Sequence, residues 1–129
     1  MESSAMRIAW YSRHAPLPSQ VAELERLAGG PVEVLNEGRM FGPAEDLALR
    51  YRQSGCDDLV VVAPLSVIAV LCQQGLHPLW AEMGRVSADR AEVTMPGRPP
   101  RHFRFRGFRR IRELRMVFDD EVVVGHPES

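Results

Sequence analysis

The chain has 129 residues, 45% of them hydrophobic and 26% charged, which is enough for one domain with a buried core but short for two. The formal net charge is −1, so the chain as a whole is neither a polybasic nucleic-acid binder nor an acidic tail protein. Cys56 and Cys72 stand outside any C-x-x-C pair or His/Cys cluster, and we expect them to be reduced packing residues.

No segment predicts a membrane span or a signal peptide. The most apolar stretch, residues 59–72, is interrupted by Pro64 and Ser66 and is too short to cross a bilayer. Residues 1–5 have neither the basic start nor the apolar centre of a signal peptide, and they look like a tag remnant or a loose terminus before Met6. We therefore expect a cytoplasmic protein.

Strand and helix patterns alternate from the first residues of the core. Residues 6–12 form a short apolar run typical of a strand that is covered on both faces. Residues 18–30 have the apolar spacing of a helix, which Ser19 can cap and which Gly29 and Gly30 end. A second, shorter strand is predicted at residues 31–37.

The alternation continues through two further helices and two further strands. Residues 42–55 predict a second helix, with acids in its first turn and arginines in its last. Residues 58–63 have the continuous valine run of a central parallel strand. Residues 64–75 predict a third helix capped by Ser66, and residues 77–83 a fourth strand. Residues 6–83 should therefore build right-handed βαβ units, in a small Rossmann-like parallel sheet of order 2-1-3-4 with helices on both faces.

From residue 91 the pattern changes to that of antiparallel strands. Residues 91–95 alternate with period 2, and the Phe and Arg side chains of residues 101–118 alternate with Gly107 where a bulge would reset the register. We expect an antiparallel hairpin or meander over residues 91–124, with an edge strand at Val122 to Val124. The predicted fold class is thus α/β, in a single domain of residues 1–129 with a Rossmann-like core and an antiparallel β extension.

Arginine is concentrated in the predicted extension. All 16 basic residues are arginine, and eight of them fall within residues 98–115, where Glu113 is the only acid. A GC-rich genome explains the absence of lysine but not this clustering. An arginine-bearing strand face must meet water, acids or phosphate, and an RNA contact would use Arg104, Arg106, Arg109 and Arg112.

The predicted topology also indicates where a ligand would bind. In an open parallel sheet, ligands bind at the carboxyl ends of the strands, where neighbouring crossovers leave toward opposite faces. For order 2-1-3-4 this point lies between the first and third strands, with the fourth strand beside it. The candidate residues there are Ser12, Arg13, His14, Pro64, Leu65, Ser66, Trp80 and Glu82.

These residues suit an anionic nucleotide. Arg13 offers a planar charged fork for phosphate, and the third helix would aim free backbone N–H groups at the same crevice. His14 can transfer a proton near neutral pH, Trp80 could stack on a base, and Glu82 could bind a sugar hydroxyl or act as a base. No His or carboxylate pair has metal-ligand spacing, and G-x-G-x-x-G, Walker and nucleophile-elbow motifs are absent, so we expect neither a metal nor another cofactor.

Each candidate also has a purely structural interpretation. Ser66 could be only a helix cap and Arg13 the partner of a surface acid. His14 could be an ordinary turn residue, and Trp80 a core side chain. The arginine-bearing strand could be a solvated sheet face.

The pattern nonetheless resembles a known family. Four short segments carry the resemblance. They are Ser12-Arg13-His14 after the first strand, Pro18-Ser19-Gln20 at the first helix, Pro64-Leu65-Ser66 after the valine-rich strand, and the Leu-Trp-Ala-Glu-Met ending of the fourth strand. Over about residues 6–83, the layout is similar to that of the minimal CRISPR-associated ring nucleases, single-domain relatives of the CARF (CRISPR-associated Rossmann fold) sensors. The arginine- and phenylalanine-rich residues 101–118 depart from that layout.

The resemblance implies a homodimer that acts in antiviral defence, binding a cyclic oligoadenylate and linearising it without metal. The ribose 2′-OH attacks the neighbouring phosphate and leaves a 2′,3′-cyclic phosphate. In that chemistry Arg13 clamps the phosphate, His14 transfers the proton, and Ser12 and Ser66 contribute hydroxyl or backbone contacts.

Two other classes of function remain open from the sequence. A non-catalytic nucleotide sensor or sponge would use the same crevice and leave its ligand intact, whereas an RNA-binding protein would use the arginine-rich strands. A structural subunit of a larger complex is favoured if the arginine face is neutralised by Asp119, Asp120 and Glu121 or by another chain.

Overall fold

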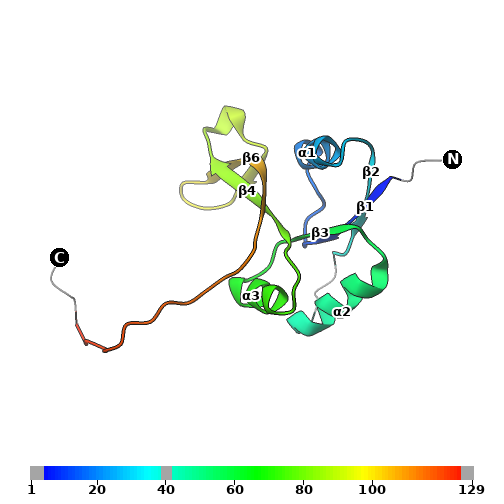
Figure 1. Cartoon of the computed structure of the whole chain (residues 1–129). Coiled ribbons are helices and arrows are strands. Elements are labelled where there is room, and N and C mark those ends of the chain that lie inside the picture. The colour runs from blue at the N-terminus through cyan, green and yellow to red at the C-terminus, as the bar shows by residue number, and fades with distance from the viewer. Residues whose placement is uncertain (1–4, 39–41, 126–129) are drawn as a thin grey trace.

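The computed structural model describes residues 5–38 and 42–125, and within these ranges it consists of three α-helices and one six-stranded sheet (Figure 1). The expected loose terminus at residues 1–5 lies outside the described residues except for Ala5. The elements are β1 (Met6–Tyr11), α1 (Pro18–Ala28), β2 (Val32–Asn36), α2 (Ala44–Ser54), β3 (Asp58–Val61), α3 (Leu65–Gln73), β4 (Leu79–Arg85), the 3-10 turn η1 (Ala88–Arg90), β5 (Val93–Met95) and β6 (Arg101–Arg110).

The sheet order is β2-β1-β3-β4-β6-β5, which confirms the predicted α/β class and the predicted order of the parallel strands. Trp10 of β1 lies opposite Val60 of β3, and Val60 lies opposite Leu79 of β4. Strand β6 runs antiparallel to β4, and β5 antiparallel to β6. The antiparallel extension therefore continues the same sheet rather than forming a separate layer.

Helices cover both faces of the parallel strands, with α1 on one side and α2 and α3 on the other (Figure 1). Ile8 and Trp10 of β1 pack with Leu24 of α1, whereas Ala9 and Tyr11 pack in the cluster that includes Leu47 of α2. Side chains alternate across a strand, so positions buried on both faces are all apolar. This explains why the buried part of β1, Ile8 to Tyr11, lacks a period-2 pattern.

The predicted serine caps are wrong. Helix α1 begins at Pro18 and α3 begins at Leu65, and neither Ser19 nor Ser66 caps a helix through its side chain. Each helix is entered from an extended residue at a proline, Leu17 before Pro18 and Pro64 itself, whose φ is −56° and ψ 150°. Each helix therefore starts two residues earlier than a serine cap would place it. Gly29, as predicted, ends α1 in the left-handed conformation with φ of 73°.

The β extension has one apolar and one arginine-bearing face, as the sequence predicts. Phe105 and Phe108 stack at 4.9 Å between ring centroids, and Phe108 meets Trp10 edge-on on the α1 side of the sheet. The register shifts where Glu82 faces Gly107 and Met83 faces Phe105, leaving Arg106 as the extra residue of a bulge. This shift keeps the Phe side chains on one face although their spacing changes from two to three.

Strand β6 ends at Arg110, and the expected edge strand at Val122 to Val124 is wrong. Arg110 pairs with Leu79, the first residue of β4, and the last backbone bond runs from the Ile111 N–H to the Pro78 carbonyl. Beyond this point β4 offers no further partner, so residues 112–125 leave the sheet. Val122, Val123 and Val124 are 90%, 74% and 95% exposed.

Candidate functional site

The topology brings the loops after β1 and β3 to one edge of the sheet, whereas Trp80 and Glu82, predicted at the end of the fourth strand, are the second and fourth residues of β4. Tyr11 and Val61 lie opposite each other, so the loops that follow β1 and β3 leave the sheet side by side. Trp80 follows Leu79, the partner of Val60, and is therefore level with the end of β3. Strand β4 continues to Arg85, so the β4–β6 pair projects past the carboxyl ends of β1 and β3.

Two hydrogen bonds fix the backbone of the loop after β1. The buried Ser12 Oγ accepts the N–H of His14 at 3.2 Å, and Trp10 Nε1 donates to the His14 carbonyl at 2.8 Å. Ser12 thus has a structural role, which the sequence alone did not reveal. The Arg13 and His14 side chains are exposed, and neither makes a hydrogen bond or ion pair with another described residue.

The start of α3 lies at the same edge with its first donors free. Pro64, Leu65 and Ser66 are exposed, and the N–H groups of Val67 and Ile68 are the first that bond back to the Pro64 carbonyl. Because no side chain caps this end, the first backbone N–H groups of α3 point toward solvent. Together with the helix dipole they make this end attractive to an anion.

Trp80 is not a core residue, since 46% of it is exposed. It lies opposite Arg109, on the face of the sheet turned away from α1. Glu82, on the same face, has its Oε2 atom 3.4 Å from Nε of Arg109. Trp80 is therefore available for stacking, while Glu82 is partly engaged by an arginine, which the sequence did not predict. Among the described residues, no hydrogen bond or ion pair joins Arg13 or His14 to Ser66, Trp80 or Glu82.

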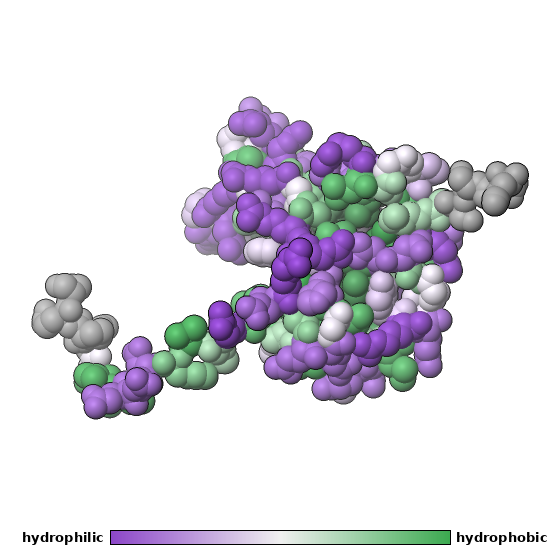
Figure 2. Space-filling model, in the orientation of Figure 1, coloured by the Kyte–Doolittle hydropathy of each residue, from purple (hydrophilic) through white to green (hydrophobic). Residues whose placement is uncertain are grey.

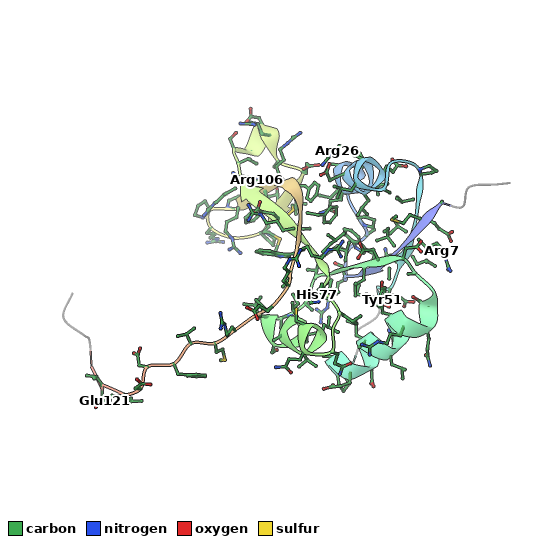
Figure 3. All side chains as sticks on the ribbon, viewed as in Figure 1. Arg7, Arg26, Tyr51, His77, Arg106 and Glu121 are labelled. Atoms are coloured by element: carbon green, nitrogen blue, oxygen red, sulfur yellow. The ribbon has the colours of Figure 1, made fainter. Side chains whose placement is uncertain are left out.

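We call the surface formed by Trp80, Arg104, Arg106 and Arg109 the arginine face. Arg106, labelled in Figure 3, lies across Gly84, where a Cβ atom would be only 1.8 Å from its Nε atom. Arg104 donates to the Arg90 carbonyl at 3.3 Å. Within the described residues, Glu82 is the only acid that pairs with an arginine of this face. The acids of the tail, Asp119, Asp120 and Glu121, do not neutralise it in the chain itself.

A cavity of about 400 Å³ lies at the opposite edge, at the amino ends of the parallel strands. There the Arg110 guanidinium donates a hydrogen bond of 2.7 Å to each carboxylate oxygen of Asp58 and one of 2.9 Å to the His77 carbonyl. Burial raises the pKa of Tyr51, which lies on this cavity (Figure 3, where Tyr51 and His77 are labelled). The lining residues are Tyr51, Asp58, Leu59, Gly75, Leu76, His77, Arg110 and Arg112.

None of the eight residues proposed from the sequence lines this cavity. Asp58 and Arg110 are 52 positions apart, and only the order of the strands brings them together. No local sequence pattern could therefore have predicted this cavity. Arg112, grouped by sequence with Arg104, Arg106 and Arg109, lines the cavity and lies apart from the arginine face.

Residues 5–38 and 42–125 contain no group of three or more His, Cys, Asp or Glu side chains arranged to hold a metal ion. Cys56 and Cys72 are free and half-buried. In the same ranges, no helix has the length and apolar character needed to cross a membrane.

Comparisons of the chain with protein-family models, with curated proteins and with solved structures find no match. What bears on function is therefore the chemistry that the chain presents at its carboxyl edge.

Proposed function

We propose that the chain binds a cyclic oligoadenylate at the carboxyl edge of its parallel strands and opens the ring by a metal-independent transesterification. One observation carries the proposal. Arg13 and His14 extend from a backbone held by the Trp10 and Ser12 bonds, and both side chains are free of other described residues. A charged fork and a titratable imidazole on a fixed loop are what recognition and cleavage of a phosphodiester require.

The neighbouring groups supply the rest of a phosphate site. Arg13 forms a bidentate contact with a phosphate, and the free N–H groups at the start of α3 contact its oxygens. Trp80 offers an exposed ring on which an adenine stacks. These contacts come from the loops after β1 and β3 and from Trp80 within β4, level with the end of β3, so an extended or cyclic oligonucleotide suits the site better than a single phosphate.

The reaction uses a nucleophile that the ligand itself carries. The 2′-oxygen attacks the adjacent phosphorus, His14 takes the 2′-OH proton, and the bond from phosphorus to the 5′-oxygen breaks. The leaving 5′-oxygen receives a proton, so the linear product has a 2′,3′-cyclic phosphate and a 5′-hydroxyl and is an isomer of the ring. Arg13 stabilises the negative charge that develops on the phosphoryl oxygens.

Incubation with cyclic oligoadenylates of several ring sizes in EDTA, followed by chromatography, tests this function. The wild-type chain should give linear products, Arg13→Ala should lose binding and cleavage, and His14→Ala should keep binding but lose cleavage. Arg26→Ala is the matched control, because Arg26 is an exposed arginine paired with Glu23 on α1.

Three other results would each overturn part of the proposal. A ring that is bound but remains intact overturns catalysis and makes the chain a sensor or sponge. Absence of binding overturns the whole proposal. Binding of single-stranded RNA that depends on Arg104, Arg106 and Arg109 but not on Arg13, and that weakens steeply with salt, points to an RNA-binding protein instead.

A further inference from the structure

The segment after Ile111 is the most exposed apolar part of the chain. We call residues 112–125 the tail; it runs from the sheet past α3 and away from the folded body (Figure 1). Figure 2 shows apolar side chains along it that are not covered by the body. Six of them are 74 to 95% exposed, namely Met116, Val117, Phe118, Val122, Val123 and Val124.

The tail has the composition of a strand that lacks a partner. Leu114, Met116 and Phe118 recur at every second position, so an extended chain places them on one side. The three consecutive valines are β-branched and favour the same conformation. Soluble monomers seldom leave so much contiguous apolar surface in water, and such a segment is a protein-interaction element.

The charges of the tail indicate what it binds. Asp119, Asp120 and Glu121 stand between its two apolar stretches, and none of them pairs with a described residue. The arginine face carries Arg104, Arg106 and Arg109; among the described residues Glu82 is the only acid in an ion pair with it, while Glu92 lies close enough to Arg104 to interact with its charge. Trp80 adds exposed apolar surface to that face. Three acids flanked by apolar groups thus match three arginines beside a tryptophan.

We propose that the tail of one copy lies on the arginine face of a second copy, so that two chains exchange tails in a symmetric dimer. The tail leaves from the amino edge near α3, on a course away from its own β4–β6 pair (Figure 1), which favours a second copy as the partner. The nine residues from Met116 to Val124 span about 30 Å when extended. This length is several times the spacing of roughly 4.8 Å between neighbouring strands, so the tail is long enough to cross the arginine face of a second copy. Each copy supplies one tail and one face, as a two-fold interface requires.

This inference does not depend on the proposed function, because it uses neither Arg13 nor His14. Trp80 belongs to both surfaces, so a bound nucleotide and the tail can compete there. Because the tail is a competitor at Trp80 and not part of the nucleotide site, loss of the tail interaction should not weaken nucleotide binding at Arg13, and failure of either proposal can be recognised without the other.

Charge reversal tests the tail exchange. The tail variant is Asp119→Arg/Asp120→Arg/Glu121→Arg, and the face variant is Arg104→Glu/Arg106→Glu/Arg109→Glu. Sedimentation of the full chain at concentrations up to ~0.1 mM, where weak interfaces still associate, should show a wild-type dimer that dissociates as salt is raised. The dimer dissociation constant of each variant alone should be at least tenfold higher than that of the wild-type chain. An equimolar mixture should recover the dimer, because both contacts become complementary again.

The matched control is Arg85→Glu, an exposed arginine of β4 that pairs with Phe103 on the opposite face of the extension. It should leave the dimer unchanged, and circular dichroism of all variants checks that they fold. A monomeric wild-type chain at every concentration, or a dimer that neither triple variant weakens, overturns the proposal. So does an RNA that binds the wild-type arginine face with no effect of the tail variant, because RNA is then the occupant of that face.

Discussion

Replacement of Trp10 by phenylalanine tests whether the loop that carries Arg13 and His14 is held as the structure indicates. Trp10 is buried between the sheet and α1, and its Nε1 atom donates to the His14 carbonyl at 2.8 Å. Trp10→Phe keeps an aromatic ring in the core and removes this donor. Among the described side chains, only Ser12 Oγ then remains hydrogen-bonded to the His14 backbone.

The size of the effect follows from the contacts that are lost. A neutral hydrogen bond contributes about 0.5–1.5 kcal/mol net, and the exposed His14 carbonyl can be solvated once the bond is lost. The smaller ring also leaves a gap in a packed core and weakens the edge-on contact with Phe108 at 6.3 Å. The free energy of unfolding should fall by about 2 kcal/mol. Restraint of the loop worth about 1 kcal/mol corresponds to about a fivefold loss in ligand affinity.

Chemical denaturation measures the free energy of unfolding. Titration with the cyclic oligoadenylate that the wild-type chain binds best measures the ligand affinity. Phe108→Leu is the matched control, since it disturbs the same cluster and leaves the Trp10 bond to His14 in place. It should lower stability without changing affinity. If Trp10→Phe lowers stability but leaves affinity unchanged, the loop does not depend on this bond and the reasoning fails.

Three further predictions concern the stability of the fold. Arg110→Met should lower the free energy of unfolding by about 1–2 kcal/mol, because the two hydrogen bonds from Arg110 to the half-buried Asp58 join β6 to β3. A double-mutant cycle with Asp58→Asn should give a coupling energy of about 1 kcal/mol. Additive effects of the two substitutions would contradict an interaction between these side chains. The Ser19 hydroxyl and the Phe105 N–H hold the pKa of Glu92 below its usual value. The contribution of Glu92 to stability is therefore present above pH ~4.5 and is lost as the pH falls through the lowered pKa. Denaturation between about pH 5 and 3 should show a flatter loss of stability for Glu92→Gln than for the wild-type chain. Burial raises the pKa of Tyr11 to about 12, so stability should decline as the pH rises from about 10 toward 12. Spectrophotometric titration of the wild-type chain should show a tyrosine that ionises near pH 12 and is lost in Tyr11→Phe, where only Tyr51, whose pKa burial also raises, still titrates. Loss of a tyrosine of ordinary pKa in Tyr11→Phe would contradict the burial of Tyr11.

The layout of the sheet could be predicted because it depends on patterns that are local in sequence. The valine run of β3 and the alternation of strands with helices predict a parallel sheet covered on both faces. The Phe and Arg spacing around Gly107 predicts a bulge, since only a shifted register keeps the aromatic side chains together. The order 2-1-3-4 is one of the few that right-handed βαβ units with helices on both faces allow.

Features that depend on distant partners could not be predicted. The end of β6 at Arg110 is set by where β4 begins, at Leu79. The starts of α1 and α3 are set by the backbone geometry of the prolines rather than by the serines that follow. The same limit applies at the site: sequence could predict which loops share an edge, but not that Ser12 and Trp10 hold the His14 backbone.

The most direct test of the proposed function is the affinity of a cyclic oligoadenylate for the wild-type chain and for Arg13→Ala, measured by titration calorimetry in EDTA. A nucleotide site at Arg13 predicts that the ring binds the wild-type chain, that its affinity falls at least tenfold in Arg13→Ala, and that its affinity is unchanged in Arg26→Ala. Equal affinity of the wild-type and Arg13→Ala chains for the ring, or no binding to either, would contradict a nucleotide site at the carboxyl edge of the sheet.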